Sequence, residues 1–397
     1  MASSLSGRGG GRWLLFPIMA AAAAAVLAVA APASACYTRV FSFGDSLADT
    51  GNYRFFYTNG SDPVLRLPYG ETFFHRATGR FTDGRIVLDF IADALGLPFV
   101  PPYLSGRRRR AEDFLHGANF AVGGATALGP DFFRDRGFDV GDVVHLDMEM
   151  KWFRDMLNLF CPGNLSRCSD MMNQSLFIVG EIGGNDYNLP LIRRIPFKNV
   201  ITFAPAVIAK ISSTITELIR LGAKALVVPG NLPIGCLPMY LLIFQSKEDY
   251  DLGTGCIRRL NEFAWYHNKL LIKELEKLRK LHPGVTIIYA DYYGAAMEVF
   301  VHPQRYGIEY PLMACCGGEG RYGVSPGVRC GRGEYKLCEN PETHGSWDGL
   351  HPSESVYRAI ATSLLRGSRT QPPIATAASS CTHSLVRQEH LSNTSPF

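Results

Sequence analysis

The sequence lacks a strong excess of either charge. Its 397 residues contain 40 Lys and Arg against 36 Asp and Glu, a formal net charge of +4. Loss of an N-terminal segment containing Arg8 and Arg12 would lower this to +2 (4 − 2). Proteins that bind nucleic acid need a basic surface for the phosphates, so this balance argues against a nucleic-acid partner. The arginine run 107–110 is interpreted as a solvated loop, and nothing in the sequence indicates an obligate protein partner.

The chain also lacks a long Ser/Gly/Pro linker and any internal repeat. Both absences favour a single folded domain, which we place at residues 36–367. The stretch 368–397 is rich in Ser, Thr, Pro and Ala and is expected to be a disordered C-terminal tail.

Residues 1–35 have the pattern of a secretory signal peptide. A basic start, residues 1–12, precedes the apolar stretch "WLLFPIMAAAAAAVLAVA" and the small-x-small site Ala33-Ser34-Ala35. We therefore expect a protein secreted to the extracellular space or cell wall. Residues 13–35 are also long enough to span a bilayer, so an uncleaved anchor in the ER or Golgi is the alternative.

Cysteine pairs with CxxC zinc-site spacing are absent, although the chain has 10 cysteines, all after residue 35. An even number in an oxidising compartment favours disulfides over metal, and Cys161 and Cys168 are close enough in sequence to pair. A Gly-rich loop contains four more, interpreted as disulfide-bonded without an assigned connectivity: Cys315, Cys316, Cys330 and Cys338. Asn-x-Ser/Thr sequons mark candidate glycosylation sites at Asn59, Asn164, Asn173 and Asn393.

Short apolar segments with strand character alternate with segments of helical periodicity. The strands are expected at 39–43, 118–122, 175–180, 224–229 and 285–290, and the helices at 83–95, 147–160, 200–221, 256–281 and 353–365. Asp83 is expected to cap the first of these helices. Such alternation predicts an α/β fold with a parallel sheet and helices on both faces.

Polar, Gly-rich turns follow the first three predicted strands. The first is Gly44-Asp45-Ser46, the second contains Gly123 and Gly124, and the third is Gly183-Gly184-Asn185-Asp186. Each alone is compatible with an ordinary turn. Ligands of parallel sheets bind beyond the carboxyl ends of the strands, so the three turns should meet. Together they would supply a nucleophilic hydroxyl, a backbone N–H and a side-chain amide for an oxyanion.

A serine nucleophile needs a base, and the segment "SWDGLHPSE" offers one. Asp348 lies three residues before His351, close enough to orient its imidazole. An ordinary helix start is the structural alternative for this segment taken alone. His267 lies on an apolar helical face and is interpreted as a core residue.

With these motifs the chain resembles the plant GDSL esterase/lipase family of the SGNH hydrolases. Four blocks match in order: "FSFGDSLADTGN", "GANFAVGGATAL", "GEIGGNDYN" and "DGLHP". The segments "YGETFFHRATGRFTDGR", "GNLPIGCLP" and "ACCGGEG" match as well. The resemblance implies a flavodoxin-like, three-layer α/β/α sandwich with a five-stranded parallel sheet. It implies catalytic Ser46, Asp348 and His351, with Gly124 and Asn185 in the oxyanion hole.

A competing nucleophile motif, Gly-x-Ser-x-Gly, occurs at 323–327. Its serine, Ser325, lies in a Gly- and Cys-rich loop rather than between a strand and a helix, so we interpret the match as chance.

The sequence therefore predicts a secreted serine carboxylic-ester hydrolase that needs neither a metal nor an organic cofactor. The segment "LPYGETFFHRATGRFTDGR" resembles the branch containing acetylajmalan esterase and sinapine esterase. That resemblance implies short-acyl or phenolic esters of plant metabolites, and O-acetyl groups on wall polysaccharides are also plausible substrates. The alternatives are an acyltransferase using the same acyl-enzyme, a lipase for longer chains, and a catalytically idle binding protein.

Overall fold

The computed structural model describes residues 37–57, 60–106, 110–245 and 249–374. The predicted signal peptide, Asn59, Asn393, residues 107–109 of the arginine run and the tail from residue 375 lie outside these ranges.

A central sheet organises the described chain. Its strands are β1 (Arg39–Phe43), β2 (Gly117–Asn119), β3 (Ser175–Val179), β4 (Ala225–Pro229), β5 (Thr286–Ala290) and β10 (Thr370–Gln371). The spatial order is β10-β5-β4-β3-β1-β2. Strands β1 to β5 pair in parallel, which confirms the predicted five-stranded parallel sheet. Strand β10 adds a short antiparallel edge next to β5.

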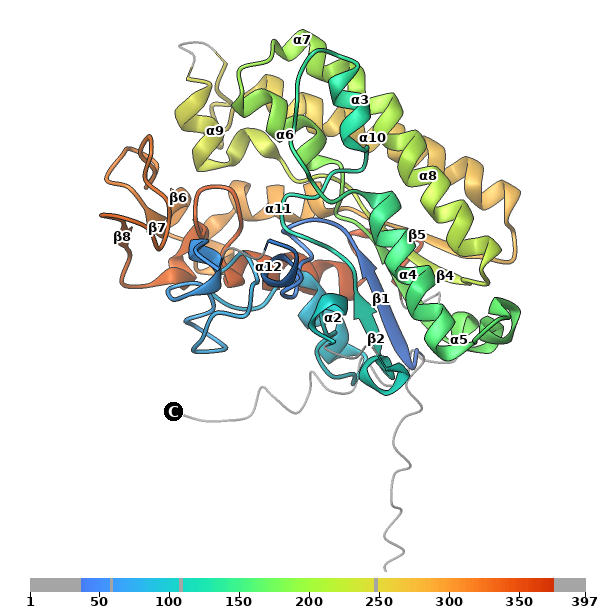
Figure 1. The fold of residues 1–397 in the computed structure, drawn as a ribbon. Coiled ribbons are helices and arrows are strands. Elements are labelled where there is room, and N and C mark those ends of the chain that lie inside the picture. Colours follow the sequence, from blue (N-terminus) through green and yellow to red (C-terminus); the bar gives the residue numbers. More distant parts are fainter. Residues whose placement is uncertain (1–36, 58–59, 107–109, 246–248, 375–397) are drawn as a thin grey trace, which may run out of the picture. The chain divides into compact units, whose positions relative to one another are not determined.

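Helices cover both faces of the sheet, which gives three layers. Helices α4 (Leu146–Phe160), α8 (Ala204–Arg220) and α10 (Arg258–Leu281) cover one face. Helices α2 (Val87–Ala94), α11 (Tyr292–Val301) and α12 (Glu354–Leu365) cover the other (Figure 1). Because side chains alternate along a strand, each strand supplies both cores: Phe41 and Phe43 face α4, and Val40 faces α2.

Shorter elements complete the fold. They are α1 (Tyr53–Phe56), α3 (Pro130–Arg134), α5 (Ser169–Asn173), α6 (Gly184–Ile192), α7 (Phe197–Val200), α9 (Pro238–Ile243), β6 (Tyr310–Ala314), β7 (Cys316–Gly317), β8 (Lys336–Leu337) and β9 (His344–Ser346). Within the described ranges, the helical run Phe197–Arg220 is long and apolar enough to cross a membrane by length and composition alone. Its apolar face, however, packs in the core against α4 and α10.

Two local predictions were wrong. Asp83 does not cap α2, which begins after Ile86; its Oδ1 instead accepts a hydrogen bond of 2.8 Å from the Glu354 N–H at the start of α12. The domain also does not end at residue 367. Thr370 pairs with Ala290, and Ile374 is buried, so the folded chain extends through the first residues of the predicted tail. Both errors arise from long-range contacts that local composition does not encode.

Four disulfides brace the described chain. The expected Cys161–Cys168 bond is present, and the Gly-rich loop is crossed by Cys315–Cys338 and Cys316–Cys330. A fourth bond joins Cys236 to Cys256. These bonds are consistent with an oxidising compartment. The sequon residues Asn164 and Asn173 are both exposed, as a glycosylation site requires.

Candidate active site

Ser46 lies just beyond the carboxyl end of β1 and is largely buried, with 8% of its surface exposed. The turn that leads to it is fixed by two contacts with the end of β3. The Asp45 N–H donates to the Glu181 carbonyl at 3.1 Å. Gly44 has a φ of +150°, and a Cβ there would lie 2.7 Å from the same carbonyl oxygen. Only glycine fits this position, which explains why the Gly-Asp-Ser motif begins with a glycine.

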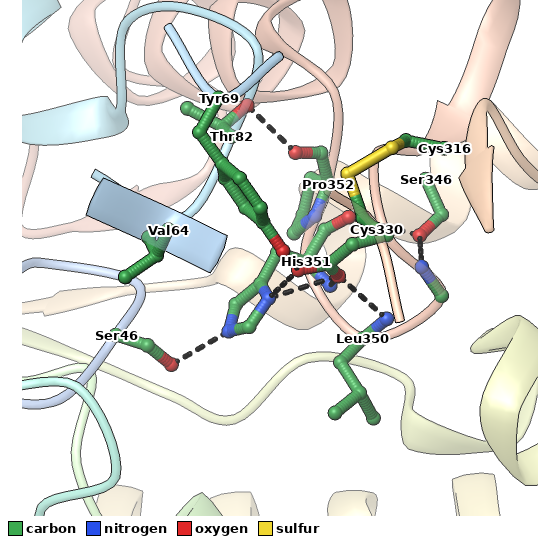
Figure 2. A network of polar contacts seen from close by, with 12 residues as sticks. Ser46, Val64, Tyr69, Thr82, Cys316, Cys330, Ser346, Leu350, His351 and Pro352 are labelled. Carbon is green, nitrogen blue, oxygen red and sulfur yellow. Dashed lines mark hydrogen bonds and ion pairs between the residues drawn. A yellow bond between two sulfur atoms is a disulfide. The ribbon is translucent and has the colours of Figure 1, made fainter. Parts of the chain in front are cut away.

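Ser46 and His351 meet although 305 positions separate them in sequence (Figure 2), and Asp348 lies on the other side of the imidazole. His351 Nε2 lies 2.8 Å from Ser46 Oγ. His351 Nδ1 lies 2.9 Å from Asp348 Oδ1 and 2.8 Å from Asp348 Oδ2. In this geometry the carboxylate holds the tautomer in which Nε2 accepts the serine proton.

The Asp348 carboxylate is surrounded by donors. Oδ1 accepts the N–H groups of Leu350 at 3.0 Å and His351 at 2.9 Å, and Tyr69 donates its hydroxyl to Oδ2 at 2.8 Å. Burial alone would raise the pKa of Asp348, but His351 and these backbone donors outweigh burial and hold the pKa below its usual range. Burial, reinforced by the Asp348 charge, raises the pKa of Tyr69, so its hydroxyl remains a donor.

The loop that carries Asp348 and His351 is held from behind by the disulfide-rich segment. Cys315 and Cys316 donate their N–H groups to the carbonyls of Ser346 and Trp347, at 3.0 and 2.7 Å. The Phe81 ring packs on the His351 ring with centroids 5.0 Å apart. The sequence alone assigned no role to the "ACCGGEG" and "YGETFFHRATGRFTDGR" segments. In the structure both contact the loop that carries Asp348 and His351, and they therefore position the triad.

In the turns after β1 and β2, two backbone N–H groups lack a hydrogen-bond acceptor within the part of the chain that the structure describes: those of Ser46 and Gly124. The neighbouring Gly123 N–H is occupied by Asp49 Oδ2 at 2.8 Å, which separates the two adjacent glycines. Gly124 has a φ of +83°, and a Cβ there would meet no atom within 4 Å, so open space lies beside it. Of the two adjacent glycines, Gly124 is therefore the one whose N–H remains available as a donor.

Asn185 lies in the first turn of α6, whose N-cap is Gly183 with a φ of +105°. The expected loop is therefore a helix start. The Asn185 side-chain Nδ2 donates to Asp45 Oδ2 at 3.1 Å and to the Ala125 carbonyl at 3.0 Å. These contacts join the turns after β1, β2 and β3. Ser46, His351 and Asn185 line one pocket, and Gly124 directly precedes Ala125, which accepts from Asn185.

A pocket of about 150 Å³ opens beside Ser46 and His351. The polar part of its wall includes Asn185, Asn188 and Asn231. The aliphatic part is formed by Leu189, Ile192, Leu232, Ile234, Leu237 and Leu350. The "GNLPIGCLP" block supplies much of the aliphatic part, a role that sequence reasoning did not assign. The high Pro and Leu content of this segment was the sequence signal that could have indicated this role.

The other chemical candidates do not form sites. Ser325 lies in the loop between β7 and β8, where its Oγ accepts the Gly320 N–H at 3.1 Å and no helix follows it. His267 is fully buried; burial lowers its pKa to about 3, and its Nδ1 lies 2.7 Å from the Tyr187 hydroxyl. The group Cys315, Cys338 and His344 has the spacing of metal ligands, but both sulfurs are already bonded to each other.

A parallel α/β sandwich with a serine, a histidine and an aspartate converging at the carboxyl edge of its sheet defines a class of hydrolases that act through a serine nucleophile. Comparison with known sequences identifies the family. The model of the GDSL-like lipase/acylhydrolase family matches residues 40–364. The chain belongs to this family, as its resemblance to the plant GDSL esterase/lipases predicted, and it is a carboxylic ester hydrolase.

The relatives found are plant proteins that align over nearly their whole length. One GDSL esterase/lipase of Arabidopsis thaliana is 46% identical over 363 residues, covering 90% of this chain and 91% of the relative. A second is 47% identical over 343 residues, covering 85% and 92%. The sinapine esterase of Brassica napus is 41% identical over 353 residues, covering 87% and 90%.

Proposed function

We propose that the protein is a secreted serine esterase in which Ser46 is the nucleophile, His351 the general base and acid, and Asp348 the residue that orients the imidazole. The observation that supports this proposal most is the unbroken chain from Ser46 Oγ through His351 to Asp348, with contacts of 2.8 to 2.9 Å. A serine hydroxyl is a poor nucleophile at neutral pH unless a base in hydrogen-bond reach takes its proton.

In the first half-reaction Ser46 Oγ attacks the ester carbonyl carbon while its proton passes to His351 Nε2. The carbonyl oxygen becomes an oxyanion that faces the N–H groups of Ser46 and Gly124 and the amide of Asn185. His351 then gives the proton to the departing alcohol. Water, deprotonated by His351, attacks the acyl carbon, and His351 returns that proton to Ser46 Oγ as the acid leaves. All catalytic groups in these steps belong to the chain.

We infer that the substrates carry small acyl groups or a phenolic acyl group. The aliphatic wall suits an acyl chain, but the volume of about 150 Å³ is below the ~300–1,000 Å³ usual for larger ligands. The similarity to a sinapine esterase points in the same direction. Secretion to the cell wall is supported by the four disulfides and by the signal-like segment 1–35. Soluble metabolite esters and acetylated wall polysaccharides then become the accessible substrates.

A panel of esters tests the proposal. Purified protein is assayed on acetylated xylan, acetylated small alcohols, choline esters of phenolic acids and long-chain triacylglycerol. We expect turnover of one or more of the first three and none of the last. Ser46→Ala should abolish turnover without unfolding the chain, and Ser325→Ala serves as the matched control with normal activity. A folded Ser46→Ala protein that still hydrolyses its ester contradicts the mechanism.

A further inference from the structure

Two carboxyl groups that line the same pocket as Ser46 are in contact. The Glu181 side chain, 3% exposed, hydrogen-bonds to the side chain of Asp45, also 3% exposed. Two ionised carboxylates cannot share such a contact, so one of the pair must hold a proton. The triad mechanism above uses neither group, yet Asp45 directly precedes the nucleophile.

The surrounding donors indicate where the proton is. Asp45 Oδ1 accepts the Leu47 N–H at 3.0 Å, and its Oδ2 accepts the Asn185 amide at 3.1 Å. The Asp45 carboxyl thus accepts two N–H donors, whereas the Glu181 carboxyl accepts one, the Gly184 N–H, so Glu181 is the better placed of the two to hold the proton and donate it. Burial and the nearby Asp45 charge raise the pKa of Glu181 well above its usual range, whereas burial raises the pKa of Asp45 only to about 6.

Among the described residues, His351 is the only group able to carry a positive charge that faces the pair. The titratable groups that face it from α4, α6, α11, α12 and the loop before α12 are Glu149, Asp186, Tyr187, Tyr292, Tyr357 and His351. None of the ion pairs among the described residues includes Asp45 or Glu181. One proton shared within the pair therefore keeps its total charge at one negative unit.

We propose that Glu181, in its protonated form, is a positioning residue: it donates to Asp45, and Asp45 in turn holds the Asn185 amide beside the Ser46 and Gly124 N–H groups. This inference rests on the proposed function, because it assumes that Asn185 stabilises the oxyanion. Loss of the Glu181 proton would place two like charges in contact and push the Asp45 carboxylate away from Asn185. Activity should therefore fall as pH rises through the titration of Glu181.

Two substitutions test the proposal. Glu181→Gln keeps a neutral side chain that still donates to Asp45, so kcat at neutral pH should remain near the wild-type value. The alkaline decline of kcat should move to higher pH, because this donor cannot ionise. Glu181→Ala removes the donor, and kcat should fall by ~10–10²-fold with KM little changed, as for a misplaced catalytic group. Thermal unfolding of each variant reports whether it folds.

Glu149→Gln is the matched control. Glu149 is also a fully buried carboxyl group, but its Oε2 accepts the Gly44 N–H at 2.9 Å and it makes no hydrogen bond to Asn185. Its replacement should leave the alkaline decline of kcat where it is in the wild type. An unchanged decline in Glu181→Gln overturns the proposal, even if the Ala variant does not fold. Failure of the proposed function would appear separately, as residual turnover in Ser46→Ala.

Discussion

Replacement of Asn185 by alanine separates a catalytic amide from one that only holds a turn. The Asn185 side chain uses its N–H groups on Asp45 and Ala125, so an oxyanion would have to share one of these hydrogens. If it does, the shared bond strengthens only when negative charge develops in the transition state. Asn185→Ala should then lower kcat by roughly 10²–10³, or about 2.7–4 kcal/mol of barrier, with KM little changed.

The structure also indicates how much folding free energy Asn185→Ala should lose. Asn185→Ala removes two hydrogen bonds, of 3.1 and 3.0 Å, which together contribute about 1–3 kcal/mol to folding. A domain of this size should tolerate that loss, so the variant remains folded and its kinetics are interpretable. Asn185→Asp should be slower than the alanine variant, because its carboxylate would face Asp45 and repel the oxyanion.

The assay measures kcat and KM on a chromogenic acetyl ester alongside the unfolding temperature. Asn188→Ala is the control: Asn188 lies one turn further along α6, lines the same pocket and accepts a hydrogen bond from Tyr240. Its loss should change KM and leave kcat near the wild-type value. A folded Asn185→Ala protein with wild-type kcat would refute the assignment of this amide to the oxyanion hole.

Three further predictions follow from individual contacts. Tyr69→Phe removes one donor from Asp348, so kcat should fall by about tenfold while the pocket and KM are preserved; steady-state kinetics test this. Gly124→Ala places a side chain on a backbone with a φ of +83°, so the free energy of unfolding should fall by about 1–2 kcal/mol and kcat should fall as well. Denaturant titration measures the first effect and steady-state kinetics the second. Burial raises the pKa of Asp186 to about 7, so the native state keeps a proton that the unfolded chain releases. The stability that Asp186 contributes should therefore be complete below about pH 4 and be lost as pH rises through about 7; a difference in unfolding temperature between the wild type and Asp186→Asn that stays constant over this range would contradict the assignment.

The sheet and its catalytic edge were predictable because both follow from local pattern. Five apolar segments alternate with amphipathic helices, and parallel strands place the residues after them at one edge. Ser46 and Asn185 could therefore be grouped without knowing any contact. The residues that support the triad from other parts of the chain could not be predicted in this way. Tyr69 reaches Asp348 across 279 positions, and no periodicity or spacing in the sequence records that distance in space.

Element boundaries failed for a related reason. Asp83 has the local pattern of an N-cap for the helix after it, but its carboxylate is used by α12, which begins 271 positions later. The segment 69–85, which contains Asp83, also contributes Arg80 and Arg85. Arg80 forms an ion pair with Asp89 in which both side chains are buried, and Arg85 contacts Glu354. When the polar side chains of a segment bond to distant elements, its sequence shows no regular local pattern. Such a segment is therefore interpreted as an irregular loop.

The acidic residues of the motif blocks have an anchoring function that the catalytic interpretation leaves unexplained. Asp49 accepts the N–H groups of Gly51, Asn52, Tyr53 and Gly123, and thereby fixes the turn that presents Gly124. Asp186 accepts those of Ala127 and Leu128, which ties the same turn to α6 and Asn185. A carboxylate can gather several backbone donors at once, whereas a neutral side chain satisfies fewer. The acids thus set the spacing of the proposed oxyanion donors, and the burial that this requires also raises the pKa of Asp49 and Asp186.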